Sequence, residues 1–302
     1  MIHNIYKFRF QTGVHLGNGM LNDTEATFPA DILFSALYIE AMKMDRAEVF
    51  YEAVAGGRIL FSDAFPYKGN TYFVPKPMLY IEKKENGSSA EKKKYKKLKY
   101  IPVGMLSAFI KGEADIDQID DKVGKYDLLT RVSKRNDTPD PKPYHVGWSP
   151  YHFGLYVIVR FQEATDQELF DKLMLSLSYT GIGGERSSGL GKFDLLRGKT
   201  DKAILEMIRR ENTDRYMLIS SALPRDEELE EVLAGSTNRL IIRSGFAYSP
   251  FSNQSPLRKR DLYVFAAGSC FAKQFDGDVY DVSDGSPHPV YRYARAMFMG
   301  VE

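Results

Sequence analysis

A glycine-rich stretch at residues 181–193, G-I-G-G-E-R-S-S-G-L-G-K-F, constrains this chain more than any other feature. Glycine lets the backbone adopt positive φ angles and approach a ligand closely. Successive backbone N–H groups in such a stretch form concave anion sites, and hydroxyl and basic side chains add donors for phosphate. The candidate phosphate-binding residues here are Gly181, Gly183, Gly184, Arg186, Ser187, Ser188, Gly189, Gly191 and Lys192. A tight or mobile connector is the alternative interpretation.

The spacing of these glycines does not fit the common nucleotide-binding motifs. A P-loop that ends on Gly191 and Lys192 needs glycine and Ser or Thr at positions where the chain has Arg186 and Phe193. A G-x-G-x-x-G motif that starts at Gly181 also fails at Arg186. Both motifs join a strand to a helix, whereas this stretch follows a predicted helix and precedes a predicted strand. A nucleotide-hydrolysing enzyme is therefore disfavoured.

The hydrophobic pattern predicts an α+β protein with two domains, residues 1–200 and 201–302. In the first domain, alternating or β-branched apolar residues indicate strands at 5–10, 58–61, 153–159 and 192–196. Apolar residues at helical spacing indicate helices that begin near residues 29–31, 46 and 166. We expect residues 65–150 to form a hairpin or loop insertion. Without it the order is β-α-β-β-α-β, that of a ferredoxin-like (RRM-like) fold, and the second domain is predicted to be a degenerate copy.

The charge of the chain indicates that any basic surface is local. Its 41 Lys and Arg residues face 40 Asp and Glu residues, for a net charge of +1. Residues 83–99 hold eight lysines against two glutamates, and such a run either follows a phosphate backbone or is a solvated segment. Smaller basic clusters in the second half, suited to phosphate or to base stacking, consist of Arg243, Arg258, Lys259 and Arg260.

Several classes of protein and site are excluded or disfavoured. Cys270 is the single cysteine, which rules out an internal disulfide and a multi-cysteine zinc site. The N-terminus lacks a signal-peptide pattern, and no apolar run is long enough to span a membrane. Asp31 is explained by the positive end of the first predicted helix rather than as a metal ligand. We therefore expect a cytoplasmic protein without a metal or a cofactor.

Three stretches resemble the RAMP superfamily of CRISPR proteins. The predicted helix, the glycine-rich stretch and the following strand are similar to the glycine-rich loop of that superfamily. Residues 28–37, F-P-A-D-I-L-F-S-A-L, look like the first-helix segment of its type III-A branch. Residues 267–271 and 289–293 look like the C-terminal loop and the final strand of the same branch. The lysine-rich segment has no such match.

The resemblance implies two ferredoxin-like domains and a non-catalytic, RNA-binding subunit of a type III-A (Csm) antiviral effector complex. Such a subunit anchors the repeat-derived 5′ handle of the guide RNA (crRNA), and contacts the large polymerase-like subunit and the first backbone subunit. An extended hairpin would press on the guide–target RNA duplex near its first base pair. The expected RNA contacts are the glycine-rich loop, the four basic residues of the second half, and His15 and Gly17 in the loop after the first strand.

His15 leaves an enzymatic alternative open. Relatives in the superfamily that cut RNA use a histidine general base, so His15 would serve a metal-independent endoribonuclease that matures guide RNA. An RNA contact, or packing alone, explains the same histidine without catalysis. A third interpretation is an interaction module whose glycine-rich loop only packs on a neighbouring subunit. We expect no catalytic residue in this chain.

Overall fold

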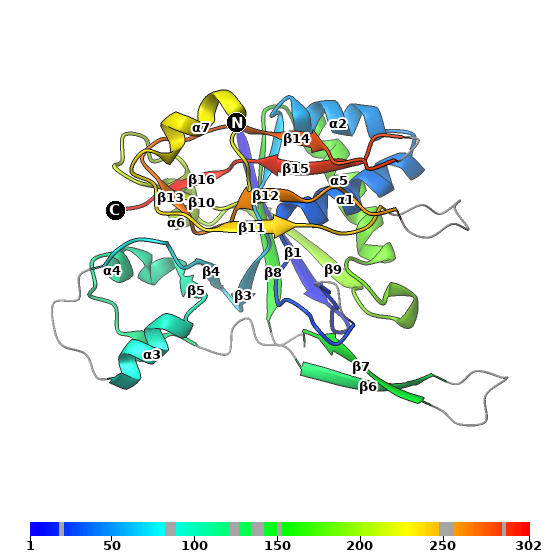
Figure 1. Ribbon diagram of the computed structural model, residues 1–302, viewed down its shortest axis with the longest axis horizontal. Coiled ribbons are helices and arrows are strands. Elements are labelled where there is room, and N and C mark those ends of the chain that lie inside the picture. The colour runs from blue at the N-terminus through cyan, green and yellow to red at the C-terminus, as the bar shows by residue number, and fades with distance from the viewer. Residues whose placement is uncertain are drawn as a thin grey trace.

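The computed structural model describes residues 1–17, 21–81, 89–120, 127–133, 142–149, 153–247, 257–285 and 288–302 (Figure 1). Part of the lysine-rich segment, residues 83–88, lies outside the described residues. The chain is an α+β protein in which the strand pairs of the described residues are antiparallel.

An antiparallel sheet forms the centre of the N-terminal half. Its strands in spatial order are β5 (Tyr100–Pro102), β4 (Thr71–Pro75), β3 (Phe65–Lys68), β8 (Gly154–Phe161), β1 (Ile2–Phe10) and β9 (Phe193–Lys199). The short β2 (Ile59–Phe61) also pairs with β8. Strand β1 lies between its two neighbours over nearly its whole length, with Tyr6 opposite both Val157 and Arg197. The strands predicted at 5–10, 58–61, 153–159 and 192–196 are confirmed, with shifted ends.

The middle of strand β1 is buried on both faces, and successive side chains of a strand point to opposite sides. The helices α1 (Ala30–Lys43), α2 (Ala47–Ala55) and α5 (Ala164–Thr180) lie on one side of the sheet (Figure 1). Tyr6 and Phe8 belong to the core that these helices form with the sheet. Ile5 faces the other way and belongs to a second core with Met217 and Cys270 of the C-terminal half. The two halves of the chain therefore share their cores through this sheet.

The region 65–150, which the sequence predicts to be an insertion, has three parts. Strands β3, β4 and β5 continue the main sheet. Between and after them lie α3 (Ser89–Lys97), α4 (Leu106–Ile110) and two short 3-10 turns, η1 (Val103–Met105) and η2 (Ile116–Gln118). The third part is a hairpin of β6 (Asp127–Ser133) and β7 (Lys142–Trp148) that projects from the body of the molecule (Figure 1).

The described residues of the C-terminal half form two helices and small antiparallel sheets. The helices are α6 (Lys202–Ile208) and α7 (Asp226–Leu233). Three pairings form the sheets: β10 (Tyr216–Leu218) between β13 (Cys270–Phe271) and β16 (Phe298–Gly300), β11 (Leu240–Arg243) with β12 (Leu262–Phe265), and β14 (Gly277–Asp281) with β15 (Tyr291–Arg295). Strand β15 packs on α1, where the Tyr293 ring lies 6.1 Å from that of Phe34, and the same ring stacks on Phe61 of β2 at 4.3 Å.

The first turn of α1 is tied to the C-terminal half by two buried carboxylates. Asp63 accepts hydrogen bonds from the backbone N–H of Ala30 (2.8 Å) and from both the N–H and the hydroxyl of Ser221 (2.8 and 2.7 Å). Asp31 pairs with Arg292 at 2.7 Å and with Arg243 at 3.1 Å. The helix begins at Ala30, as predicted, but the helix end explains only part of the role of Asp31, because its carboxylate joins two arginines of the other half.

Burial raises the pKa of Asp63 to about 6 even though three donors stabilise its ionised form. We expect Asp63→Ala to lower the free energy of unfolding by about 2–4 kcal/mol, because two buried N–H groups and a hydroxyl lose their acceptor. Asp63→Asn retains an acceptor oxygen and should cost much less. Chemical denaturation of both variants beside the unmodified chain measures this difference.

The unmodified chain and the Asp63→Asn variant together test how the free energy of unfolding depends on pH. Because the pKa of Asp63 is higher in the folded chain than in an unfolded one, at about 3.9, its ionisation opposes folding, and its contribution to stability falls as pH rises from about 4 to 6. The Asp63→Asn chain lacks that component. The difference in unfolding free energy between the two chains should therefore shift in favour of the variant over this window. A difference that is constant across the window would contradict the raised pKa.

Candidate nucleic-acid interface

The glycine-rich loop between α5 and β9 is built on positive φ angles. Gly181, Gly183, Gly189 and Gly191 have φ values of 80°, 90°, 92° and 81°, which side chains other than glycine rarely adopt. Two of these glycines also allow close packing inside the loop. A Cβ on Gly191 would lie 2.1 Å from the carbonyl oxygen of Ile182, and one on Gly181 would lie 3.0 Å from that of Gly191. The inner part of the loop is thus a tight connector.

His15, a separate candidate in the sequence, lies against this loop. Its carbonyl oxygen accepts a hydrogen bond from the N–H of Gly184 at 2.8 Å. Its ring nitrogen Nδ1 lies 2.7 Å from the carbonyl oxygen of Gly147 in β7, and since a carbonyl only accepts, Nδ1 carries the proton. The ring is held between two glycines, because a Cβ on Gly17 would lie 2.6 Å from Nε2 and one on Gly184 would lie 2.7 Å from Cδ2.

The outer part of the loop presents donors to solvent. The backbone N–H groups of Glu185, Arg186 and Ser187 follow one another and have no hydrogen-bond partner among the described residues. The side chains of Arg186 and Lys192 form no ion pair with any residue that the structure describes, and Ser187 and Lys192 are exposed. Glu185, the single acid of the loop, lies 3.4 Å from Arg131 of β6 and accepts a hydrogen bond from Ser188. These groups suit an anionic ligand such as a phosphate.

A cavity of about 270 Å³ lies between the loop and α1. One wall consists of the loop residues from Gly181 to Gly184 together with Arg186, and His15 and Gly17 lie beside them. The opposite wall is an uncharged face of α1, formed by Ile32, Ser35, Ala36 and Ile39. The cavity therefore combines an apolar wall for a base or sugar with polar donors at its rim, the usual composition of a ligand site.

The four basic residues predicted in the C-terminal half do not line this cavity. Arg243 pairs with Asp31, Arg258 pairs with Asp261 at 2.9 Å, and Arg260 donates to the carbonyl oxygen of Asp281. Burial lowers the pKa of Lys259, and the neighbouring Arg292 and Arg243 lower it further. Each of the four residues thus has a structural neighbour, and RNA contact by any of them stays a prediction.

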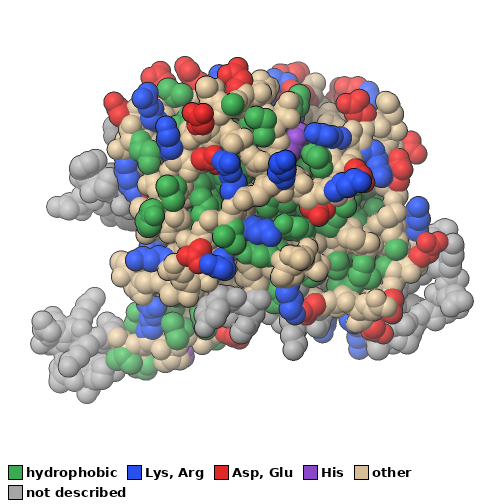
Figure 2. All heavy atoms as spheres, turned by 180° about the vertical axis from the view of Figure 1, so that it is seen from behind, with side chains coloured by type: hydrophobic (Ala, Val, Ile, Leu, Met, Phe, Trp, Pro, Cys, Tyr) green, Lys and Arg blue, Asp and Glu red, His purple; other side chains and the backbone are tan. Residues whose placement is uncertain are grey.

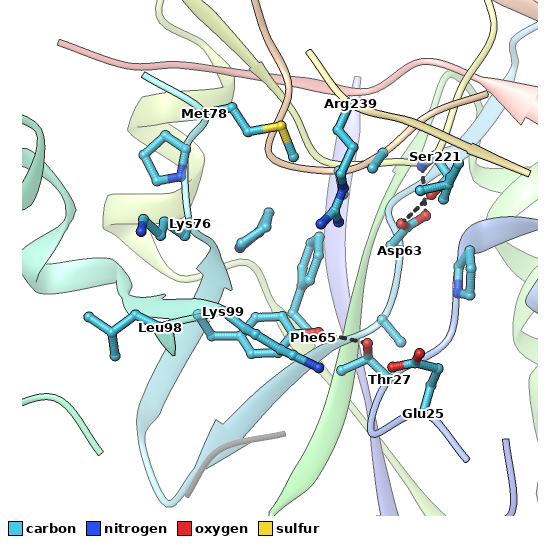
Figure 3. Close-up of a pocket in the computed structure, with 18 of the residues that line it drawn as sticks. Glu25, Thr27, Asp63, Phe65, Lys76, Met78, Leu98, Lys99, Ser221 and Arg239 are labelled. Atoms are coloured by element: carbon cyan, nitrogen blue, oxygen red, sulfur yellow. Dashed lines mark hydrogen bonds between the residues drawn. The ribbon is translucent and has the colours of Figure 1, made fainter. Parts of the chain in front are cut away.

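A second and larger cavity, of about 930 Å³, was not foreseen from the sequence. We call it the interdomain cleft, because residues 63–65, 75–79 and 95–100 of the N-terminal half line it opposite residues 239–243 and 266–267 of the C-terminal half. Figure 3 shows Arg239, Lys99, Asp63 and Thr27 around it. Among the residues that line this cleft, only those of the lysine-rich run belong to a pattern that the sequence analysis singled out. Arg239 is an isolated basic residue, and no sequence pattern indicated a role for it.

No group of His, Cys, Asp or Glu residues in the described part of the chain has the arrangement of a metal site. None of the described helices has the length and apolarity needed to cross a membrane. Cys270 is buried, and burial raises the pKa of its thiol to about 12, so this thiol is a core side chain rather than a nucleophile.

The sequence is similar to CRISPR-associated proteins over its whole length. The family model of the CRISPR Csm4 C-terminal domain matches residues 211–301. A protein of Mycobacterium tuberculosis (strain CDC 1551 / Oshkosh), named CRISPR system Cms protein Csm4, is 36% identical over 306 residues, which cover 100% of this chain and 98% of that protein. The Streptococcus thermophilus protein of the same name is 32% identical over 312 residues, with 100% of both chains covered.

Solved structures show the same fold. A chain of the Csm3–Csm4 subcomplex in the type III-A CRISPR-Cas interference complex superposes with a TM-score of 0.66 at 16% identity, with 100% of both chains covered. A chain of a Csm1–Csm4 cassette in complex with pppApA gives a TM-score of 0.59 at 19% identity, with 99% of this chain and 98% of that chain covered. Fold and sequence thus define a RAMP-type CRISPR subunit, which confirms the predicted superfamily and its type III-A branch. The chain belongs to the Csm4 family.

The glycine-rich loop offers a matched pair of variants. Gly183 and Gly189 have nearly the same φ, but a Cβ on Gly183 would lie 2.4 Å from the carbonyl oxygen of His15, whereas a Cβ on Gly189 would meet nothing within 4 Å. Both alanine variants bear the cost of a left-handed residue, about 1–2 kcal/mol. We expect Gly183→Ala to lower the unfolding free energy by a further ~1–3 kcal/mol. Equal losses in chemical denaturation would show that His15 does not pack on the loop.

Proposed function

We propose that this chain is a non-catalytic, RNA-binding subunit of a type III-A effector complex, which anchors the repeat-derived 5′ handle of the guide RNA at the glycine-rich loop. The observation that carries the proposal is the meeting of His15, the loop and the first helix around one cavity with free donors at its rim. In this proposal the two halves are ferredoxin-like domains, 1–200 and 201–302, of which the second is degenerate. The protein acts in the cytoplasm without a cofactor or a metal.

The chemistry of the loop favours a single-stranded nucleic acid. Backbone N–H groups and the charges of Arg186 and Lys192 bind phosphates whatever the base sequence. The uncharged wall of α1, with Ile32 and Ile39, accepts a base or a sugar, and Ser35 adds a hydroxyl.

The partners in this proposal are those that the relatives' names and structures suggest. The matching solved chains come from complexes of Csm4 with Csm3 and with Csm1. We infer that this chain contacts the corresponding backbone and large polymerase-like subunits. Arg131 links the projecting β6–β7 hairpin to Glu185 and to the carbonyl oxygen of Ser188 in the glycine-rich loop. In this proposal the hairpin reaches the guide–target RNA duplex near its first base pairs.

The surroundings of His15 favour binding over cleavage. Only 6% of this residue is exposed, and its Nδ1 proton is committed to the Gly147 carbonyl oxygen. A general base must reach the 2′-hydroxyl that it deprotonates, at about 2.6–3.2 Å, and the glycines on both sides of the ring restrict that approach. Incubation of repeat RNA with the isolated protein in EDTA tests this point. Cleavage that disappears in His15→Ala would establish the endoribonuclease instead.

Binding of a handle-containing guide RNA tests the site itself. We expect Arg186→Ala and Lys192→Ala each to weaken affinity several-fold, and to lower the slope of log affinity against log salt by about 0.7, the value for one lost phosphate contact on a single strand. Lys199→Ala is the matched control, because Lys199 is an exposed lysine at the far end of β9, the strand that begins directly after Lys192. Fluorescence anisotropy measures these affinities. Equal losses of affinity in Lys192→Ala and Lys199→Ala would contradict the assignment of Lys192 as a phosphate contact.

A further inference from the structure

The interdomain cleft concentrates positive charge. Six basic residues, Lys76, Lys96, Lys97, Lys99, Arg239 and Arg243, line it against two acids, Glu25 and Asp63. The local excess of four exceeds the net charge of the whole chain, which is +1. By contrast, basic and acidic side chains are interspersed on the face seen in Figure 2. A hollow lined by one sign of charge focuses the field and attracts the opposite charge.

Two of the six cations are engaged by other residues, and the other four form no ion pair within the part of the chain that the structure describes. The Lys76 ammonium lies 3.9 Å from the centre of the Tyr95 ring and donates to the Tyr95 carbonyl oxygen, and Arg243 pairs with Asp31. Lys96, Lys97, Lys99 and Arg239 form no ion pair with any described residue. Figure 3 shows the Arg239 side chain extending into the cleft from the segment before β11. Lys99 points into the cleft from the opposite side.

The cleft also holds groups that suit a nucleobase. Thr27 and Tyr100 share a hydrogen bond of 2.7 Å between their hydroxyl groups on its floor, and the exposed carboxylate of Glu25 lies nearby (Figure 3). A carboxylate or hydroxyl oxygen accepts hydrogen bonds from the exocyclic amino groups of bases. Cations for phosphate therefore lie beside hydrogen-bond acceptors for bases.

The walls of the cleft are fixed by backbone contacts. Lys76 N–H donates to the Lys99 carbonyl oxygen, and Met78 N–H donates to the Gly268 carbonyl oxygen across the two halves. Gly268 has a φ of 95°, and a Cβ on it would lie 2.7 Å from the carbonyl oxygen of Lys76. Glycine is thus needed for this close approach, and the cleft is formed before any ligand binds, which lowers the entropic cost of binding.

The cleft adjoins the glycine-loop cavity through the first turn of α1. Phe28 and Pro29 line the cleft, whereas Ile32 and Ser35 of the same helix line the other cavity. A helix rises 1.5 Å per residue, so that the step of three positions from Pro29 to Ile32 spans only about 4.5 Å along its axis. A single strand that leaves one cavity can therefore enter the other around this turn.

We propose that the interdomain cleft is a second RNA site, which binds two or three unpaired nucleotides of the same strand that the glycine-rich loop binds. Arg239 and Lys99 contact phosphates from opposite walls, and Glu25, Thr27 and Tyr100 contact the bases. The size of the cleft, about 930 Å³, suits a few nucleotides rather than a double helix. This inference rests on the proposed function only in taking the guide RNA as the ligand.

Photo-crosslinking of the full chain to a guide RNA that carries 4-thiouridine at single handle positions separates the two sites. Crosslinks to peptides that contain residues 97–100 or 239–243, at positions next to those that crosslink to 181–192, would support the second site. Crosslinks to 181–192 alone would overturn it and leave the proposed function intact. Crosslinks to the cleft alone would support the second site and contradict RNA binding at the glycine-rich loop. Crosslinks to neither segment would contradict both sites.

Charge reversal gives an independent measurement. We expect the double variant Lys99→Glu and Arg239→Glu to bind the guide RNA at least about tenfold more weakly, with a salt slope lower by about 1.4, since two phosphate contacts on a single strand are lost. Both residues are exposed, so the fold should be retained. Lys172→Glu, an exposed lysine on α5 without an ion pair among the described residues, is the control and should change affinity less than twofold.

The same variants distinguish RNA from a protein occupant. If a segment of a neighbouring subunit fills the cleft instead, the double variant should assemble poorly with Csm3 and Csm1 homologues while its affinity for guide RNA is unchanged, and that result would overturn the proposal. Arg239→Lys should recover most of the affinity lost in Arg239→Glu if charge on a phosphate is the contact. Failure of lysine to recover it, with normal folding, would reject the assigned phosphate contact.

Discussion

The two buried carboxylates at the first turn of α1 hold the C-terminal half of the chain in place. Asp63 satisfies the N–H groups of Ala30 and Ser221, and Asp31 neutralises Arg292, of which only 3% is exposed. Removing one partner of a buried ion pair costs about 3–5 kcal/mol, because the remaining charge stays buried without compensation. Both candidate RNA sites adjoin this turn, so the relative position of their walls depends on these contacts.

The parts of the site that follow one another in the chain were predictable. The loop at 181–193 lies between a helix and a strand whose apolar periodicities are evident, and the start of α1 at Ala30 follows from the proline before it. The sequence named His15 and this loop only as separate candidates, and the strand order explains why they meet. Strands β1 and β9 are adjacent and antiparallel, which brings the loop after β1 to the loop before β9.

Contacts between distant segments were not predictable from local pattern. Asp31 lies 212 residues from Arg243 and 261 residues from Arg292, and no periodicity encodes such pairs. Arginine in an exposed-looking cluster suggests a nucleic-acid contact, but the fold places Arg243 beside a buried acid. The interdomain cleft illustrates the same limit, because Lys99 and Arg239 gain significance only when the close approach at Gly268 brings their segments together.

The glycine-rich loop reconciles two interpretations that the sequence left open. Its inner glycines, such as Gly183 and Gly191, allow backbone contacts that no larger residue permits, and so the loop is a tight connector. That packing fixes the outer residues, where the N–H groups of Arg186 and Ser187 remain unpaired among the described residues. An anion site gains from fixed donors, because little conformational freedom is lost on binding. The structural role of the inner glycines is therefore the physical basis of the binding role proposed for the outer ones.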